Sequence, residues 1–180
     1  MISKSLIRKE YRKIRNQLSS KRKEEASKAA LQALLPLKEK RSYVLSFASK
    51  KNEIDLWPFN LILAKEQKLL LSLVVKEHLV PYVIQDFDKE LTLNLEFKIL
   101  EPNPSLSKQI PVSEISCVLV PALAFDKNNH RLGYGLGYYD RFLSSLSNCQ
   151  KIGIGFKEQF YSKTFPVEEF DISLDEVLLF

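Results

Sequence analysis

The feature that most restricts the fold of this chain is the apolar run CVLVPALAF, residues 117–125. It contains no polar side chain, so no face of it is suited to contact with water. Such a run is typical of a β-strand that is covered on both faces, as the strands of parallel sheets are. The run therefore predicts a layered protein in which helices pack on both sides of a sheet.

Further short apolar runs alternate with stretches of helical character along the chain. The strand-like runs are residues 42–49, 68–75, 151–156 and 175–180. Strands that alternate with helices predict an α/β fold, here three layers with a mostly parallel sheet flanked by helices. The length of 180 residues and the absence of a repeat or linker predict a single domain, 1–180. Ligands of such folds bind beyond the carboxyl ends of the strands.

Two helices are expected before the first strand. The first has an apolar stripe whose members fall within a sector about 60° wide at 100° per residue. The stripe consists of Ile7, Tyr11, Ile14 and Leu18. A second, alanine-rich helix is expected from about Ser20 to Leu35, where Pro36 would end it. Later helices are expected from about Asp55 and over residues 138–146.

Residues 91–99, LTLNLEFKI, alternate strictly between apolar and polar side chains. This period of two predicts one half-buried strand, with every second side chain on the buried face. The apolar set is Leu91, Leu93, Leu95, Phe97 and Ile99. The following segment, residues 101–111, contains three prolines and is expected to be an ordered loop.

Positive charge is concentrated near the N-terminus, although the net charge of the chain is only +5. Lys4, Arg8 and Arg15 fall within about 40° of one another on the first helix, beside its apolar stripe. Cations that border a buried stripe can line a cleft, but they can also form an ordinary solvated face. Both interpretations stay open for these three residues, whereas Lys9 and Lys13 point away and are expected in solvent.

The loop RLGYGLGYYDR, residues 131–141, holds three of the five glycines of the chain and follows the apolar run. Glycine allows backbone N–H groups to converge on an anion, and the flanking Arg131 and Arg141 could pair with phosphate. The pattern is neither a P-loop nor a dinucleotide fingerprint, so a tight structural turn is equally compatible with it. Asp140 could hold Mg²⁺ beside a phosphate, or it could cap the following helix.

Several classes of protein are not expected. The cysteine and histidine spacings fit no zinc site, and no Ser-His or Cys-His pair suggests a nucleophile. No apolar run approaches a membrane span and no secretion signal is present, so we expect a cytoplasmic protein with no membrane partner. A nucleic-acid surface would interleave aromatic residues with the basic ones, but only Tyr11 does so. A kinase for another small molecule remains compatible with the loop.

Residues 120–143, VPALAFDKNNHRLGYGLGYYDRFL, resemble the signature of the 5-formyltetrahydrofolate cyclo-ligase family. Lys4, Arg8 and Arg15 match the basic motif of its N-terminal helix. The remaining matches follow in the family order and cover nearly the whole chain: residues 47–55, 99–102, 153–160 and 165–178. Two departures are Asn129, where the family has glycine, and Phe170, where many members have histidine. Asparagine tolerates left-handed backbone, so the turn at Asn129 is expected to be kept.

The resemblance implies ATP- and Mg²⁺-dependent cyclisation of 5-formyltetrahydrofolate to 5,10-methenyltetrahydrofolate, with release of ADP and phosphate. The partners would be these small molecules, with no nucleic acid and no membrane, and the chain is expected to be a monomer.

The matched motifs also imply residue roles. The nucleotide would contact Lys4, Arg8, Arg15, Arg131, Leu132, Gly133, Tyr134, Gly135, Leu136, Gly137, Tyr138 and Tyr139. The folate would contact Ala48, Glu53, Glu101, Tyr134, Gly135, Gly137 and Tyr138. Asp140 and Asp171 would hold the magnesium ion, and Arg131 and Tyr139 would act in catalysis.

Overall fold

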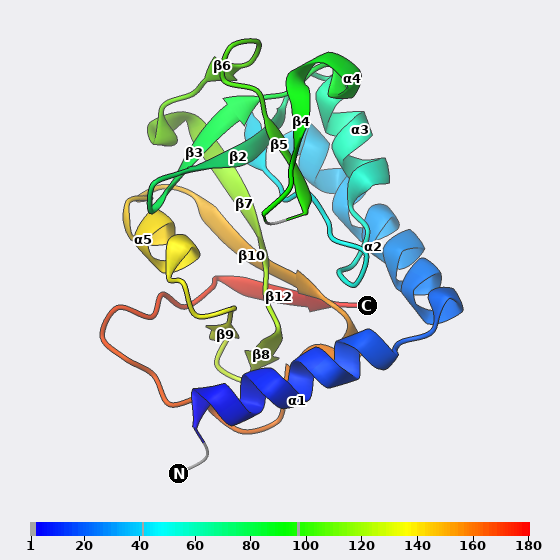
Figure 1. The fold of residues 1–180 in the computed structure, drawn as a ribbon, viewed down its shortest axis with the longest axis vertical. Helices are drawn as coiled ribbons and strands as arrows, with labels where there is room; N and C mark the ends of the chain where they lie inside the picture. Colours follow the sequence, from blue (N-terminus) through cyan, green and yellow to red (C-terminus); the bar gives the residue numbers. More distant parts are fainter. Residues whose placement is uncertain (1–2, 41, 97) are drawn as a thin grey trace.

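A seven-stranded sheet forms the centre of the computed structural model, which describes residues 3–40, 42–96 and 98–180 (Figure 1). The strand order is β12-β10-β7-β1-β2-β3-β6. In chain order these strands span Tyr43–Leu45 (β1), Leu69–Val75 (β2), His78–Val83 (β3), Lys108–Gln109 (β6), Ile115–Pro121 (β7), Gln150–Gly155 (β10) and Glu176–Leu179 (β12).

The strands from β12 to β2 are parallel, while β3 and β6 extend one edge in antiparallel pairing. The prediction of an α/β domain with a mostly parallel sheet is therefore confirmed. Strand β3 was not predicted, because its sequence HLVPYV carries a proline that weakens the strand signal. Its position next to an edge of the sheet is one that tolerates proline.

Helices cover both faces of this sheet. The α-helices of the described residues span Lys4–Gln17 (α1), Ser20–Lys40 (α2), Trp57–Lys65 (α3), Phe87–Glu90 (α4) and Tyr138–Ser144 (α5). Figure 1 shows α2 and α3 on one side of the sheet and α5 on the other. Val44 packs toward α2 and α3, while its neighbour Leu45 packs toward α5. Because successive strand residues point to opposite faces, both faces of the central strands must be apolar.

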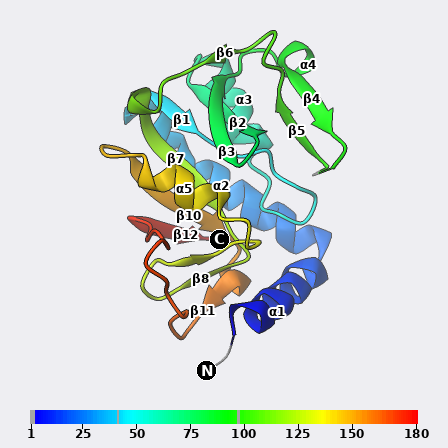
Figure 2. The same cartoon turned by 60° about the vertical axis from the view of Figure 1, so that its left-hand side comes forward.

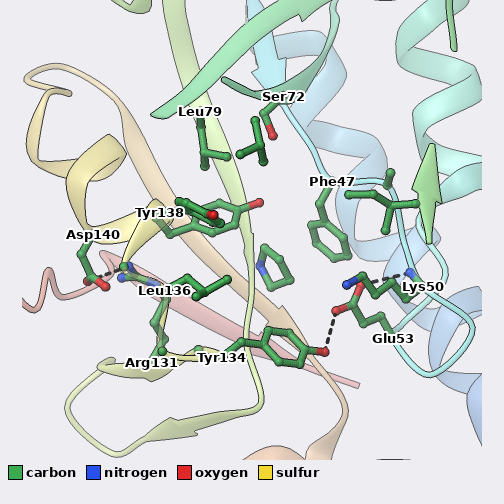
Figure 3. Close-up of a pocket in the computed structure, with 18 of the residues that line it drawn as sticks. Phe47, Lys50, Glu53, Ser72, Leu79, Arg131, Tyr134, Leu136, Tyr138 and Asp140 are labelled. Carbon is green, nitrogen blue, oxygen red and sulfur yellow. Dashed lines mark hydrogen bonds and ion pairs between the residues drawn. The ribbon is translucent and has the colours of Figure 1, made fainter. Parts of the chain in front are cut away.

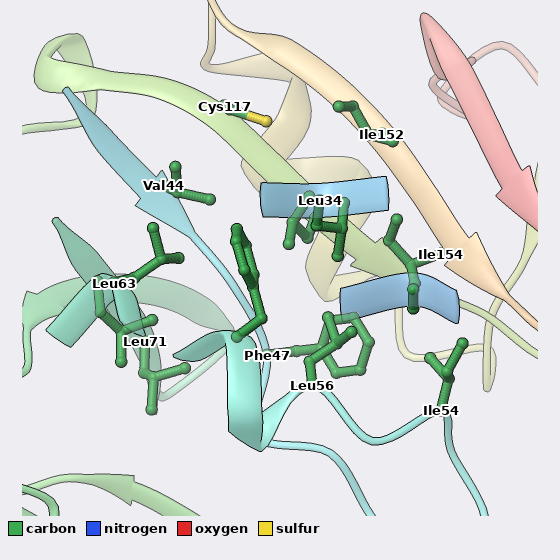
Figure 4. Packing of buried hydrophobic residues seen from close by; sticks show 14 of the residues in the cluster. Leu34, Val44, Phe47, Ile54, Leu56, Leu63, Leu71, Cys117, Ile152 and Ile154 are labelled. Atoms are coloured by element: carbon green, nitrogen blue, oxygen red, sulfur yellow. The ribbon is translucent and has the colours of Figure 1, made fainter. Parts of the chain in front are cut away.

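The larger core cluster lies between the sheet and the helices α2 and α3, as Figure 4 shows around Leu34, Leu63 and Ile154. The prediction that Pro36 ends the second helix is wrong, because α2 continues to Lys40. Proline removes a helical hydrogen bond but does not forbid a last turn that other contacts hold. Leu37 packs on the core, and Lys38 Nζ lies 2.8 Å from Glu66 Oε1 on α3's C-terminal side.

The apolar run 117–125 does not form one strand. β7 ends at Pro121, and after a bend Ala124–Asp126 (β8) joins a small second sheet of order β11-β8-β9. The other strands of this sheet are Arg131–Leu132 (β9) and Phe160–Tyr161 (β11). Helix α1 packs on it through Ile7 and Tyr11, as predicted from their spacing, and Figure 2 shows α1 beside β8 and β11.

The prediction of one half-buried strand over residues 91–99 is also wrong. Leu91–Asn94 (β4) and Ile99–Pro102 (β5) form an antiparallel hairpin that projects in front of the central sheet in Figure 1. Leu93 and Leu95 are 58% and 79% exposed, so the apolar positions do not share a buried face. The predicted position of Phe97 lies outside the described residues.

Two smaller expectations can be compared with the structure. Asn129 has φ 60°, so it keeps the left-handed conformation that was expected at this position. Residues 101–111, expected to be a loop, include the end of β5 and the short β6. Within the described residues, no helix combines the length and apolar character that spanning a bilayer would need.

Candidate active site

A cavity of about 340 Å³ lies at the carboxyl ends of the central strands, where ligands of α/β sheets bind (Figure 3). Its walls come from the start of α1, the segment after β1, strand β2, the β4–β5 hairpin and the loop between β9 and α5. Of the residues that the family motifs assigned to the site, all except Arg15 line this cavity. The fold thus brings together side chains that are up to 167 positions apart in the chain.

The glycine loop forms the lower wall of the cavity and is held in an unusual backbone conformation. Gly135 and Gly137 have φ angles of 102° and 69°, a region that L-residues other than glycine rarely adopt. Arg8 lies directly against this loop: its Nε donates to the carbonyl of Gly133 at 3.0 Å. A Cβ on Gly135 would lie 3.4 Å from the Arg8 Cζ. Of the two interpretations left open for Arg8, its position in the cavity wall agrees with the one in which it lines a cleft.

Lys4 closes the same wall from the first turn of α1. Its Nζ lies 2.5 Å from Asp171 Oδ2 and 3.1 Å from Glu168 Oε2. Burial acts against the charge of Lys4, but the hydrogen bonds to Asp171 and Glu168 outweigh it and raise the pKa of Lys4. Burial also opposes ionisation of Asp171, yet the hydrogen bond from Lys4 keeps the pKa of Asp171 below its usual value.

Arg131 and Asp140 form a second ion pair, next to the first along the chain segment of Asp171 and Ile172. Arg131 Nη2 donates to Asp140 Oδ1 at 2.7 Å, and Nη1 donates to the Ile172 carbonyl at 2.8 Å. Burial lowers the pKa of Arg131, while the neighbouring Asp140 favours its charged form. Arg141, which was expected to bracket the loop, instead donates to the carbonyls of Glu77 and Leu136 and does not line the cavity.

The carboxylates of Asp140 and Asp171 both reach the cavity, each beside a cationic side chain. Among residues 3–40, 42–96 and 98–180 no three His, Cys, Asp or Glu side chains gather as a metal site. Mg²⁺ commonly takes only one or two protein carboxylates and fills its shell with phosphate oxygens and water. Two carboxylates, Asp140 and Asp171, are too few to bind Mg²⁺ by themselves. They fit a magnesium ion whose other ligands are phosphate oxygens and water.

Arg15 is placed differently from Lys4 and Arg8. Its side chain is 1% exposed and lies beneath the cavity, where it does not line the wall. Nη1 donates to the Ala122 carbonyl at 3.2 Å and lies 3.6 Å from Glu53 Oε1, while Nη2 donates to the Tyr134 hydroxyl. Arg15 thus links α1 to the bend after β7, the glycine loop and the segment after β1.

Glu53 and Tyr134 are in contact with each other in the wall of the cavity (Figure 3). The Tyr134 hydroxyl donates to Glu53 Oε1 at 3.4 Å, and the backbone N–H of Lys50 donates to Glu53 Oε2 at 3.0 Å. Burial, together with the charge of Glu53, raises the pKa of Tyr134, and the same causes raise that of Tyr139. Both phenols are therefore neutral hydrogen-bond donors at ordinary pH. Tyr138 and Tyr139 both line the cavity, so neither is confined to the core.

The upper part of the cavity is largely apolar and was not predicted residue by residue. Its walls include Phe47, Leu71, Val74, Leu79 and Ile99. These residues belong to apolar strand-like runs or follow them, so the sequence could indicate that they were buried but not that they faced a ligand. One acidic side chain, Glu101 of β5, enters this apolar part and is 4% exposed.

Known proteins are similar to this chain over almost its full length. The model of the 5-formyltetrahydrofolate cyclo-ligase family matches residues 1–179. The 5-formyltetrahydrofolate cyclo-ligase of Haemophilus influenzae is 30% identical over 183 residues, covering 96% of this chain and 95% of that protein.

Solved structures are similar as well. The Aquifex aeolicus 5,10-methenyltetrahydrofolate synthetase superposes with a TM-score of 0.84 at 29% identity, covering 97% of this chain and 88% of the other. The 5,10-methenyltetrahydrofolate synthetase from Mycoplasma pneumoniae has a TM-score of 0.78 at 23% identity, with 98% of each chain covered, and shows the shared fold.

Proposed function

The chain belongs to the 5-formyltetrahydrofolate cyclo-ligase family, and on this premise we propose that it cyclises 5-formyltetrahydrofolate to 5,10-methenyltetrahydrofolate with ATP and Mg²⁺. ADP and phosphate would be released. The observation that carries the proposal is the composition of the cavity. One half is built from cations, glycine backbone and two aspartates, and the other half is apolar with buried carboxylates.

The cationic half suits a triphosphate. Lys4, Arg8 and the backbone of residues 131–139 would contact the nucleotide, because ammonium, guanidinium and N–H groups are the usual partners of phosphate oxygens. Asp140 and Asp171 would hold the magnesium ion, which when bound offsets the negative charge of the phosphates.

The apolar half suits the ring system of the folate. Ala48, Glu53 and Glu101 would contact it together with Tyr134, Gly135, Gly137 and Tyr138 of the loop. The two substrates would then meet at the glycine loop, which borders both halves. Positioning of this kind supplies much of the catalysis of phosphoryl transfer.

In the proposed reaction the formyl oxygen attacks the terminal phosphorus of ATP, and the bond to ADP breaks. The N10 lone pair then attacks the formyl carbon, N10 releases its proton, and the carbon–oxygen bond breaks as phosphate leaves. Arg131, held by Asp140 and Ile172, would offset charge that develops on the transferred group. Tyr139, a neutral phenol, would donate a hydrogen bond to the reacting groups.

Arg15 would contribute indirectly to this site. Its contacts to Glu53 and to the Tyr134 hydroxyl support a positioning role for Arg15 between the folate half and the glycine loop. A monomeric state and a cytoplasmic location stay predictions from the sequence, as does the absence of a nucleic-acid partner.

The direct test mixes the purified protein with 5-formyltetrahydrofolate, Mg²⁺ and ATP and follows the near-ultraviolet absorbance of the methenyl product. We expect ATP-dependent product, and its absence at any reasonable enzyme concentration would refute the proposal. ADP release without methenyl product would instead favour a kinase acting on another small molecule.

The variant Arg8→Ala probes the nucleotide half. We expect it to raise the KM for ATP about 10- to 100-fold, the loss typical of a hydrogen bond to a charged group. Lys9→Ala removes an exposed cation from the adjacent position of α1 and serves as the control with unchanged kinetics. If Arg8→Ala unfolds the protein while the surviving fraction keeps its ATP kinetics, the assigned role of Arg8 is wrong.

A further inference from the structure

Arg141 joins two walls of the cavity from outside it. Its Nη2 donates to the Leu136 carbonyl of the glycine loop at 3.1 Å and to the Glu77 carbonyl at 3.0 Å, and its Nε donates to the same Glu77 carbonyl at 3.2 Å. Glu77 lies in the turn between β2 and β3, and Figure 1 shows this turn beside α5, which carries Arg141. The β2–β3 hairpin supplies Val74 and Leu79 to the cavity, and the loop supplies another part of its wall. The bridge therefore fixes these two walls relative to each other.

The same guanidinium also packs on the loop itself. Gly137 has φ 69°, and a Cβ added there would lie 2.9 Å from Arg141 Nη1. The Arg141 Cζ lies over the ring of Tyr138, 5.5 Å from its centroid, within the range of a cation–π contact. Leu136, Gly137 and Tyr138 are consecutive residues, and all three line the cavity. One side chain outside the cavity thus holds three neighbouring residues of its wall.

A second arginine holds the other end of the loop in a similar way. Arg8 Nε donates to the Gly133 carbonyl at 3.0 Å, and Arg141 donates to the Leu136 carbonyl. A backbone carbonyl repels a phosphate, and a cation bound to that carbonyl lessens the repulsion. The two arginines therefore hold the loop by its carbonyls, which suits a loop whose N–H groups bind an anion.

A guanidinium suits the position of Arg141 better than an ammonium does. The planar fork reaches the carbonyls of Glu77 and Leu136 at once, while its carbon lies over the Tyr138 ring. A lysine carries the same charge as a compact group on a flexible stem and does not reproduce this set of contacts. Shape therefore distinguishes Arg141 from a cation that acts through its charge alone.

We propose that Arg141 is a positioning residue for nucleotide binding, which holds the glycine loop and Tyr138 in the conformation that receives the phosphates. The inference rests on the proposed function, because the ligand of the loop is taken to be Mg-ATP. Arg141 does not line the cavity, so this role differs from the direct pairing with phosphate that its place in the sequence suggested. The affinity for the nucleotide then depends on the shape of Arg141 and not on its charge.

The test compares Arg141→Lys, which keeps the charge, with Arg141→Met, which removes it. Binding of Mg-ATP is measured by calorimetry, and the KM for ATP and kcat are measured in the cyclisation assay. We expect both variants to bind Mg-ATP about 10-fold more weakly, since both lose the hydrogen bonds of the guanidinium. The KM for ATP should rise by a similar factor while kcat at saturating ATP changes little, because Arg141 does not touch the reacting groups.

The control for net charge is Lys127→Met. Lys127 is exposed in the turn between β8 and β9, and its replacement removes one positive charge as Arg141→Met does. We expect unchanged affinity for Mg-ATP. Melting temperatures of all variants complete the test, because a residue that only stabilises the fold would change the melting temperature and leave the affinity of the folded protein as it was. Arg141 is itself exposed, so Arg141→Lys is expected to fold.

The outcomes separate the inference from the proposed function. Similar losses of affinity in Arg141→Lys and Arg141→Met support the inference. Parent affinity in Arg141→Lys overturns it, because charge alone then suffices, and the proposed function stands if the unaltered protein cyclises the folate. If the unaltered protein binds Mg-ATP but forms no methenyl product, the proposed function is overturned and the affinities of the two variants still decide the role of Arg141. If it neither binds Mg-ATP nor forms product, both are overturned.

Discussion

Replacing the first two loop glycines by alanine, one at a time, should change stability in opposite directions. Gly135 has φ 102°, where an alanine is strained, whereas Gly133 is not among the residues with positive φ. A Cβ added at Gly133 would meet no atom within 4 Å. The same chemical change therefore tests two different backbone conformations two positions apart.

The magnitudes follow from the backbone. An L-residue in the left-handed region costs about 1–2 kcal/mol, so Gly135→Ala should lower the free energy of unfolding by that amount. The added Cβ would lie at ordinary contact distance from Arg8 Cζ, 3.4 Å, so steric overlap adds little to the strain. Gly133→Ala should raise the free energy of unfolding by about 0.4–1 kcal/mol, because alanine restricts the unfolded chain more than glycine does.

Urea unfolding followed by tryptophan fluorescence can measure both changes, because the chain has a single tryptophan. Trp57 lies on α3 and packs edge-on against Phe87, with ring centroids 5.3 Å apart, well separated in sequence from the loop. The corresponding shifts in melting temperature are about 2–4 °C per kcal/mol for a domain of this size. Equal shifts of the two variants, or a Gly135→Ala variant as stable as the parent, would refute the backbone conformation on which the estimate rests.

Two further predictions concern buried charge. Arg15→Met should lower the free energy of unfolding by about 3 kcal/mol in a denaturation experiment, because Glu53 loses its buried cation. Adding Glu53→Gln to this variant should recover part of the loss. If the effects of the two substitutions simply add, Arg15 and Glu53 do not interact as described. Lys4→Met should cost about 1 kcal/mol at neutral pH. The pKa of Asp171 is lower in the folded protein than in the unfolded chain. The difference in stability between the parent and Lys4→Met should therefore be complete above the unfolded pKa of the aspartate and shrink as pH falls below about 4. A pH series of melting curves measures this difference. Because the pKa of Lys4 is raised, the stability that the ion pair contributes should decline at high pH only above about pH 10.5. A difference between the parent and Lys4→Met that does not change with pH would show that the ion pair is not the cause of the difference.

The sequence predicts well those features that depend on local periodicity. Ile7 and Tyr11 are buried on one side of α1 because the helical repeat alone fixes their direction. The same repeat groups Arg15 with Arg8, but it gives an angle around the helix and not what covers each turn. Arg8 meets the glycine loop, while Arg15, two turns further on, lies under the bend after β7 and is buried.

Features that depend on tertiary context could not be predicted in this way. The alternation at Leu93 and Leu95 is the same for a half-buried strand and for a hairpin that stands away from the core, so a period of two cannot distinguish them. The motif around Glu101 indicated a binding residue. Asn94 lies across the hairpin and donates to only one of the two carboxylate oxygens of Glu101. No pattern in the sequence contains this information.

The contact between Lys4 and Asp171 has a consequence for the order in which the molecule is made. The two residues are 167 positions apart, so a growing chain exposes the cations of α1 long before their acidic partners have been synthesised. Contacts between such distant segments carry a large loop-closure cost and form late in folding. The wall of the cavity that Lys4 forms with Asp171 can therefore assemble only after translation has passed residue 171. Until then Lys4 lacks the carboxylates that neutralise it in the folded protein.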